Sequence, residues 1–157
     1  MQVDSDVVVM RATLDVVLDV TARLREPDRV ELMLSTGREP MDCMADSFAV
    51  SRRTMAASVH GRPIAVFGIA NALDQPYGIP WGVSTDEADR YPMSILRLGR
   101  MWIDIVAPFY PALLNVVHRD NRRSLRYVRA LGFTIGDAEP FGPSGAMFHQ
   151  IWRACNV

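Results

Sequence analysis

The sequence contains no lysine, only two cysteines and no long apolar run. All 17 basic residues are arginines, a bias that coding preference explains, although arginine also suits fixed contacts to carboxylates and phosphates. Cys43 and Cys155 lie far apart without metal-ligand spacing, which favours two ordinary thiols in a reducing compartment. No stretch approaches the roughly 20 apolar residues of a membrane span, and no basic segment precedes an apolar one at the N-terminus. We therefore expect neither a membrane span nor a signal peptide.

Common catalytic motifs are absent as well. The sequence has no Gly-x-Ser-x-Gly turn, no His-Glu-x-x-His pair and no phosphate-loop motif, and no metal site is predicted. A net charge of −1 argues against bulk affinity for nucleic acid, although a local arginine patch remains open. With 157 residues, 49% of them hydrophobic, the chain is predicted to be one domain, 1–157, with a proper core.

Hydrophobic periodicity predicts a mixed α+β domain. Strands are predicted over residues 7–10, 55–59, 64–70, 79–85, 113–117, 133–135 and 146–152. Helices are expected after Thr13, from Pro27 to Gly37 and from Pro40, where an apolar stripe starts at Met41. A further helix uses Ile95, Leu98, Trp102 and Ile105 as its apolar stripe. Residues 136–145, rich in glycine and proline, are predicted to form a loop.

One stretch, 113–135, organises the prediction as strand, helix and strand. Asp120 is predicted to accept hydrogen bonds from the first N–H groups of a helix that starts beside Asn121. Gly132 suits the left-handed position that ends a helix. The segment Asn121-Arg-Arg-Ser-Leu-Arg-Tyr-Val-Arg-Ala-Leu-Gly-Phe133 resembles the Asn…Ala…Tyr…Gly-Phe signature of the GNAT N-acetyltransferase superfamily. The order of strand, two helices, three strands, helix, strand, helix and two strands is also similar to that fold.

This resemblance implies an α+β, GNAT-like fold. Its central sheet is mixed, mostly antiparallel and of about seven strands, and about four helices flank it. More narrowly, the sequence is similar to small GNAT-like proteins of tailed phages, including internal virion proteins. The segments that carry this likeness are Arg25…Asp28…Glu31, 61–68, Trp81…Thr85-Asp86, 110–115 and 142–149. The likeness implies a phage or prophage origin, other virion proteins as partners, and a place in the virion or the host cytoplasm.

The family's cofactor is acetyl-CoA, whose diphosphate binds N–H groups of a glycine-containing loop after the fourth strand. Here that position reads Ser84-Thr-Asp-Glu-Ala-Asp-Arg-Tyr-Pro92, without glycine and with three carboxylates that repel a diphosphate. Ser84, Thr85 and Arg90, together with Asn121, are the predicted cofactor contacts if acetyl-CoA binds. The family's proton-donating tyrosine, four residues before Gly132, is replaced by Val128. Tyr127, one position earlier, is predicted to be a packing aromatic.

An amine acceptor needs a base, and Glu31 and His118 are the predicted catalytic candidates. Arg25, Asp28 and Glu31 are spaced three apart, which favours a salt-bridge network, and Glu31 is the acid to test first as a base. His118 lies at the end of the fifth predicted strand. Asp86, Glu87 and His149 are candidates by residue type alone.

Three functions remain open from the sequence. The first is a GNAT-fold phage protein with a structural or interaction role, in which catalysis has been lost. The second is an active, divergent N-acetyltransferase that moves an acetyl group from acetyl-CoA to an amine. The third is a binding module whose arginines, at helical spacing, contact nucleic acid, the CoA 3′-phosphate or an acidic partner: Arg119, Arg122, Arg126 and Arg129. A solvated outer helix face is the alternative explanation of this stripe.

Overall fold

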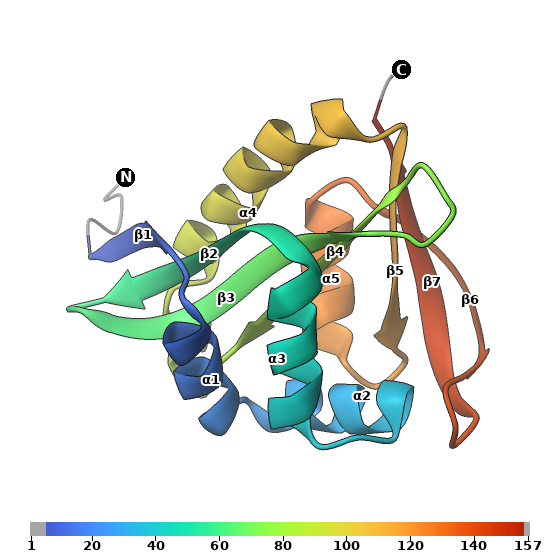
Figure 1. The fold of residues 1–157 in the computed structure, drawn as a ribbon, viewed down its shortest axis with the longest axis horizontal. Helices are drawn as coiled ribbons and strands as arrows, with labels where there is room; N and C mark the ends of the chain where they lie inside the picture. Colours follow the sequence, from blue (N-terminus) through green and yellow to red (C-terminus); the bar gives the residue numbers. More distant parts are fainter. Residues whose placement is uncertain (1–5, 156–157) are drawn as a thin grey trace.

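Seven strands form one sheet in the order β1-β2-β3-β4-β5-β7-β6 in the computed structural model, which describes residues 6–155. The strands are β1 (Val7–Arg11), β2 (Ser51–Val59), β3 (Arg62–Asn71), β4 (Gly78–Ser84), β5 (Ala112–His118), β6 (Thr134–Phe141) and β7 (Ala146–Ala154). All neighbours are antiparallel except β4 and β5, which are parallel. The predicted mixed, mostly antiparallel sheet is therefore confirmed (Figure 1).

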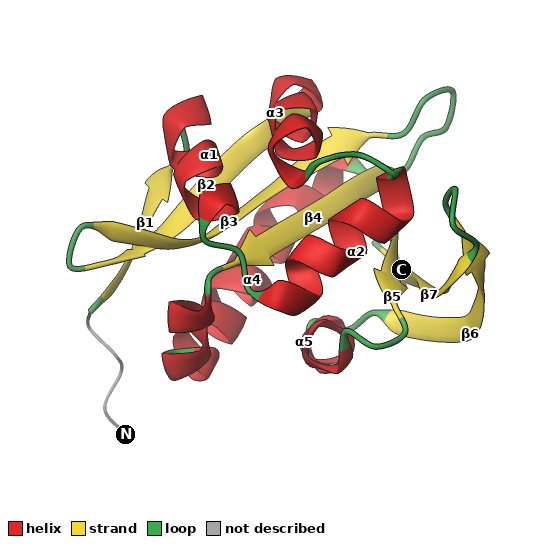
Figure 2. Cartoon of the chain, turned by 90° about the horizontal axis from the view of Figure 1, so that it is seen from below, coloured by secondary structure: helices red, strands yellow, loops and turns green. Residues whose placement is uncertain are grey.

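Helices cover both faces of the sheet (Figures 1 and 2). They are α1 (Leu14–Ala22), α2 (Glu26–Thr36), α3 (Pro40–Val50), α4 (Pro92–Val106) and α5 (Arg122–Ala130), with short 3-10 turns η1 (Asp86–Arg90) and η2 (Ala107–Phe109). One core cluster joins α1 and α3 to the sheet around Val17, Met44 and Val66. Another joins α4 to β5 and β7 around Ile103 and Leu113. Residues 6–155 thus hold five α-helices, and the three helices predicted after Thr13, from Pro27 and from Pro40 all lie between β1 and β2, where the family's order has two.

Most predicted helix ends are confirmed. Thr13 caps α1 by accepting a hydrogen bond from the Val16 N–H at 3.4 Å, and Gly37 (φ 69°) and Gly132 (φ 90°) take the left-handed conformation. The cap of α5 was placed one residue too early. Asn121, not the exposed Asp120, accepts from the Ser124 N–H at 3.5 Å, because only the residue directly before the helix is positioned to reach that group.

Two other predictions were wrong in detail. Met41 and Ile105 belong to the predicted apolar stripes but are 43% and 52% exposed, since α3 and α4 bury narrower faces than the spacing suggests. Residues 136–141, predicted as loop, extend β6. Among the described strands, β6 lies at the edge of the sheet and pairs with β7 alone, so it tolerates Pro140 and a register shift between Ile135 and Ala138.

The parallel strands β4 and β5 diverge (Figure 1). Their register contains a single Cα pair, Gly78 with Leu113, near the start of both strands. Beyond this pair the two backbones are no longer paired in the sheet, so their carboxyl ends, at Ser84 and His118, border an opening in the sheet. This opening positions the candidate site.

Candidate functional site

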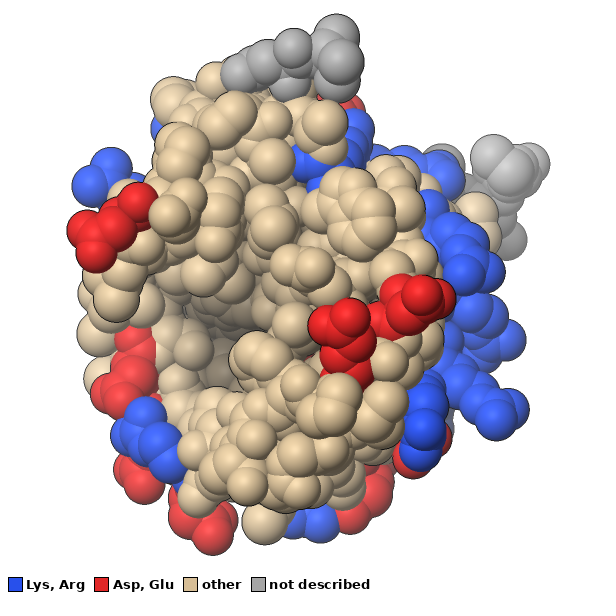
Figure 3. Space-filling model, turned by 90° about the vertical axis from the view of Figure 1, so that its right-hand side faces the viewer, with Lys and Arg blue, Asp and Glu red and all other residues tan. Residues whose placement is uncertain are grey.

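A cavity of about 680 Å³ occupies the opening between β4 and β5 and reaches both faces of the sheet. Leu32 and Met44 line it on the side of α2 and α3, whereas Leu96 and Tyr127 line it between α4 and α5. The molecule is visibly hollowed on the face at the right-hand side of Figure 1 (Figure 3). The cavity's volume falls within the range of small-molecule sites.

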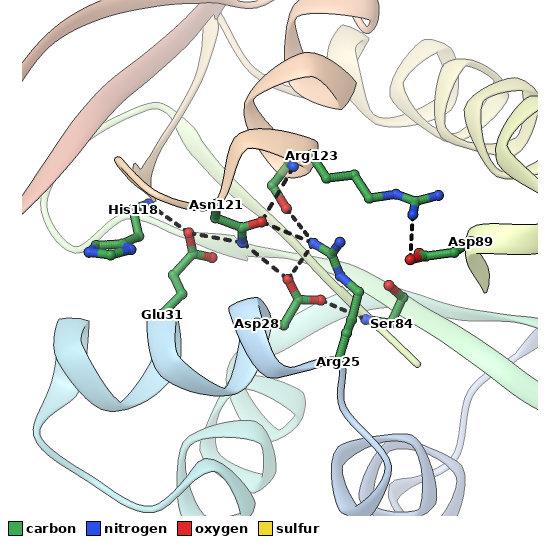
Figure 4. Close-up of polar contacts among 9 residues, drawn as sticks. Arg25, Asp28, Glu31, Ser84, Asp89, His118, Asn121 and Arg123 are labelled. Atoms are coloured by element: carbon green, nitrogen blue, oxygen red, sulfur yellow. Dashed lines mark hydrogen bonds and ion pairs between the residues drawn. The ribbon is translucent and has the colours of Figure 1, made fainter. Parts of the chain in front are cut away.

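Two carboxylates of α2 accept hydrogen bonds from backbone N–H groups at the ends of the two diverging strands. The Ser84 N–H of β4 donates to Asp28 Oδ2 at 3.0 Å, and the His118 N–H of β5 donates to Glu31 Oε1 at 2.6 Å (Figure 4). Strands that separate lose ladder partners for their backbone groups, and buried backbone N–H groups need replacement partners. Here α2 supplies them, so it straddles the opening.

Buried polar side chains continue this arrangement toward α5. Arg25 Nη2 donates to Asp28 Oδ1 at 2.8 Å, to Asn121 Oδ1 at 3.1 Å and to Ser124 Oγ at 3.0 Å. Asn121 Nδ2 donates to Asp28 Oδ1 at 3.1 Å and to Glu31 Oε1 at 3.4 Å. Arg25, Asp28 and Asn121 are only 6%, 4% and 1% exposed. We call these five residues, Arg25, Asp28, Glu31, Asn121 and Ser124, the α2 network; its Arg25–Asp28 ion pair confirms the predicted salt bridging.

Burial and its neighbours set the protonation of Glu31, whose pKa is raised to about 7. Burial is the largest cause, and the nearby Asp28 charge also raises the pKa, whereas the hydrogen bonds from His118 and Asn121 and the charge of Arg25 lower it. A carboxyl group with a pKa near neutrality is suited to exchange protons at physiological pH. The same shift also makes the stability of the fold depend on pH.

Glu31→Gln is expected to flatten that pH dependence. The folded protein keeps the Glu31 proton from pH 4.5, its ordinary pKa, up to about pH 7, while the unfolded chain releases it. The stability that this group contributes is fully present below pH 4.5 and is lost as pH rises through about 7, by about 3 kcal/mol. The glutamine side chain of the variant retains the acceptor oxygen for the His118 N–H but cannot titrate. Thermal unfolding between pH 4.5 and 8 measures the difference, with the exposed Glu139→Gln as control; equal slopes in wild type and Glu31→Gln would contradict this assignment.

Two further side chains connect the elements that line the cavity. Asn115 Nδ2 on β5 donates to the Pro80 carbonyl of β4 at 2.5 Å, which joins the strands just beyond their one backbone pair. The Tyr127 hydroxyl on α5 donates to the Ile95 carbonyl of α4 at 3.2 Å and fills the space where a side chain at Gly99 would lie. Burial raises the pKa of Tyr127 to about 12. Tyr127 is thus a packing aromatic, as predicted, and Val128 packs against the neighbouring core.

The loop after β4 offers few free donors. The Ser84 N–H is bonded to Asp28, and both the N–H and the hydroxyl of the buried Thr85 donate to the Ile64 carbonyl, at 2.9 and 3.2 Å. Asp89 forms an ion pair with Arg123 of α5 at 2.5 Å (Figure 4). With no glycine and three carboxylates between 84 and 92, these residues do not fit an acetyl-CoA diphosphate.

The predicted site residues are thus partly brought together. Glu31, Ser84 and Asn121 lie in or beside the α2 network, whereas Arg90 is exposed on η1. His118 takes part through its backbone only. Its ring points away from Asn121 (Figure 4). The ring packs edge-on against Phe148, with 5.1 Å between the two ring centroids.

Sequence reasoning missed Asn115 and the contact between Gly99 and Tyr127. Two signals were available: a polar residue inside an apolar strand, and a glycine inside an amphipathic helix, which indicates close approach of a neighbour. Among residues 6–155, no group of three or more His, Cys, Asp or Glu side chains is arranged to hold a metal ion. None of the helices described is long and apolar enough to cross a membrane.

Solved structures share this fold over nearly the whole chain. Ard1 from Thermoplasma volcanium is 12% identical, with a TM-score of 0.76 over 97% of this chain and 99% of that one. YncA, a putative acetyltransferase from Salmonella typhimurium with its cofactor acetyl-CoA, is 12% identical, with a TM-score of 0.72 over 98% and 96%. A GNAT-family acetyltransferase from Streptococcus pneumoniae is 14% identical, with a TM-score of 0.60 over 96% and 99%. No family model and no curated protein matches the sequence. The chain therefore has the GNAT fold.

Proposed function

We propose that this protein uses the GNAT fold as a structural or interaction component and has lost acetyl-CoA-dependent catalysis. The observation that carries the proposal is the pair of α2 carboxylates bonded to both diverging strands, Asp28 to Ser84 and Glu31 to His118. A ligand lying between β4 and β5 would have to replace these bonds or leave buried polar groups unpaired. Each such group costs about 1–3 kcal/mol when it loses its partner.

Two other contacts beside the opening support the same proposal. Asn115 occupies the narrow end of the opening, and the ion pair between Asp89 and Arg123 joins η1 to α5 at the wide end. Val128 stands where the resemblance leads us to expect a proton donor. The likeness to small phage proteins supports the finer part of the proposal: a phage particle component, with other virion proteins as partners, in the virion or the host cytoplasm.

Calorimetric titration with acetyl-CoA tests the loss of cofactor binding. We expect no saturable heat at millimolar cofactor, because the donors at the opening are already bonded within the protein. A folded sample is verified by circular dichroism before each titration. Micromolar binding accompanied by release of free CoA in the presence of an amine would overturn the proposal.

An active N-acetyltransferase is the second candidate, and Glu31 favours it. A carboxyl group with a pKa of about 7 beside a cavity of about 680 Å³ could accept the proton of an amine. In this case a panel of small amines and peptides would reveal turnover, and Glu31→Gln would abolish it without preventing cofactor binding. A silent panel with the wild-type protein would reject this candidate.

The arginines of α5 are the proposed contact with an acidic partner or nucleic acid. Arg122, Arg126 and Arg129 are exposed on the helix, whereas Arg119 precedes it and lies 3.9 Å from Asp120. Arginine side chains gather along one side of the face drawn in Figure 3. Changing Arg122 and Arg126 to glutamate should abolish retention on nucleic acid or particles, and unchanged retention would reject this role.

A further inference from the structure

A second cavity, of about 470 Å³, lies away from the α2 network, beside the narrow end where β4 and β5 begin. Its walls come from the start of β2, the loop 72–77 between β3 and β4, and the segment around η2. None of the residues assigned above to cofactor binding or catalysis lines it. Its volume is typical of small-molecule sites.

A β-bulge brings two arginines into this cavity. In a regular strand, neighbouring side chains point to opposite faces. The register of β2 with β3 is broken between Arg52 and Met55, and both Arg52 and Arg53 line the cavity. Arg53 has the left-handed conformation (φ 54°), which a non-glycine residue adopts only when its surroundings hold it there. Trp102 of α4 supplies that hold, because its indole N–H donates to the Arg53 carbonyl at 3.2 Å.

The cavity carries positive charge next to aromatic rings. The Arg53 guanidinium lies 4.7 Å from the centroid of the Phe109 ring, which is itself 63% exposed. Neither Arg52 nor Arg53 forms an ion pair with a carboxylate of residues 6–155. No acidic residue lines the cavity in the described part of the chain. Its two guanidinium groups therefore keep their donors for a ligand.

The wall of the cavity opposite the two arginines, formed by Tyr110 and the loop 72–77, is fixed by hydrogen bonds and packing. The Tyr110 hydroxyl donates to Asn71 Oδ1 at 2.5 Å, and the Tyr110 ring packs where a side chain at Gly78 would lie. The loop 72–77 is closed by the Ala72 N–H, which donates to the Tyr77 carbonyl at 3.2 Å. A rigid wall with tyrosine rings on one side and guanidinium groups on the other is preorganised for a planar anion.

We propose that this cavity binds a small ligand that carries a phosphate beside a planar ring, the chemistry of a nucleoside monophosphate. Arg52 and Arg53 bind the phosphate, since guanidinium groups match phosphate oxygens with two parallel hydrogen bonds. Phe109 and Tyr110 contact the ring. The site is independent of the proposed loss of acetyl-CoA binding, because the two cavities share no charged side chain.

Calorimetric titration with adenosine 5′-monophosphate tests the site, with inorganic phosphate and adenosine as partial ligands. We expect saturable binding at one site, at least about tenfold tighter for the monophosphate than for either part. The double variant Arg52→Gln with Arg53→Gln should weaken it by at least about tenfold. Arg11→Gln with Arg97→Gln removes the same charge from two exposed positions on β1 and α4 that line neither cavity, and should leave the affinity unchanged.

A second variant separates ligand binding from folding. Phe109 is largely exposed, so Phe109→Ala should leave the thermal unfolding midpoint unchanged. The variant should bind adenosine 5′-monophosphate more weakly, because it lacks the ring contact, and should bind inorganic phosphate as the wild type does. Absence of saturable binding to the wild-type protein would overturn the proposal. So would loss of binding in the variant of Arg11 and Arg97 but not in the variant of Arg52 and Arg53, which would place the anion site outside this cavity.

Discussion

Arg25→Met is expected to lower the free energy of unfolding by about 3–5 kcal/mol, the usual cost of removing one partner from a buried ion pair. Arg25 and Asp28 are 6% and 4% exposed, and Arg25 Nη2 is shared by three acceptors. Methionine fills a similar volume, so the loss is electrostatic rather than a packing defect. Asp28 then keeps only neutral donors, the Ser84 N–H and the Asn121 amide.

The same helix provides a matched control for this prediction. Arg29 pairs with Glu26 at the same spacing of three residues, but both side chains are exposed, at 44% and 67%. Exposed pairs of this kind contribute about 0–1 kcal/mol, so Arg29→Met should be nearly neutral. Chemical denaturation of both variants gives the comparison, and equal losses would contradict a buried, structural role for the α2 network.

Asn121→Ala is expected to lower the free energy of unfolding by about 2–4 kcal/mol, because the Asn121 side chain both caps α5 and bonds to the α2 network. Its Oδ1 caps α5, which contributes about 0.5–2 kcal/mol. Its amide also satisfies Arg25, Asp28 and Glu31 inside the fold, and a buried group that loses its partner costs about 1–3 kcal/mol. The residue is 1% exposed, so water cannot easily take its place.

Thr13→Ala isolates the capping contribution. Thr13 caps α1 through its hydroxyl and is exposed, so its loss removes a cap and little else. The loss in free energy of unfolding should be larger for Asn121→Ala than for Thr13→Ala. The difference between the two losses measures the contribution of Asn121 to the α2 network. If urea denaturation gives the same loss for both, Asn121 is only a helix cap and the network contributes nothing measurable.

Local sequence signals were sufficient for most of the fold. Periodicity located the strands, and Thr13, Gly37 and Gly132 marked helix ends that the structure confirms. The errors lie where the sheet, not the local pattern, decides. The composition of residues 136–141 predicts a loop, but pairing with β7 makes most of them part of β6. Exposure of Met41 and Ile105 depends on which face of each helix meets the sheet, which spacing alone leaves ambiguous.

The candidate site was harder to predict because its parts meet across the chain. The spacing of Arg25, Asp28 and Glu31 indicated a shared face, but not that Asn121 lies among them, 93 positions away from Asp28. Ser84 was expected to contact a phosphate, and nothing in its own neighbourhood indicates that its N–H is bonded to Asp28. The resemblance indicated the loop after the fourth strand, whereas only the three-dimensional structure reveals the opening beside it and the contacts that bridge this opening.

Amide hydrogen exchange of Ser84 and His118, followed by NMR, tests the central claim most directly. If Asp28 and Glu31 hold these two groups, both amides exchange slowly in the protein alone and their rates do not change when acetyl-CoA is added at millimolar concentration. Rapid exchange of both amides in the free protein, followed by protection on addition of acetyl-CoA, would contradict the account and show that the opening is a working cofactor site.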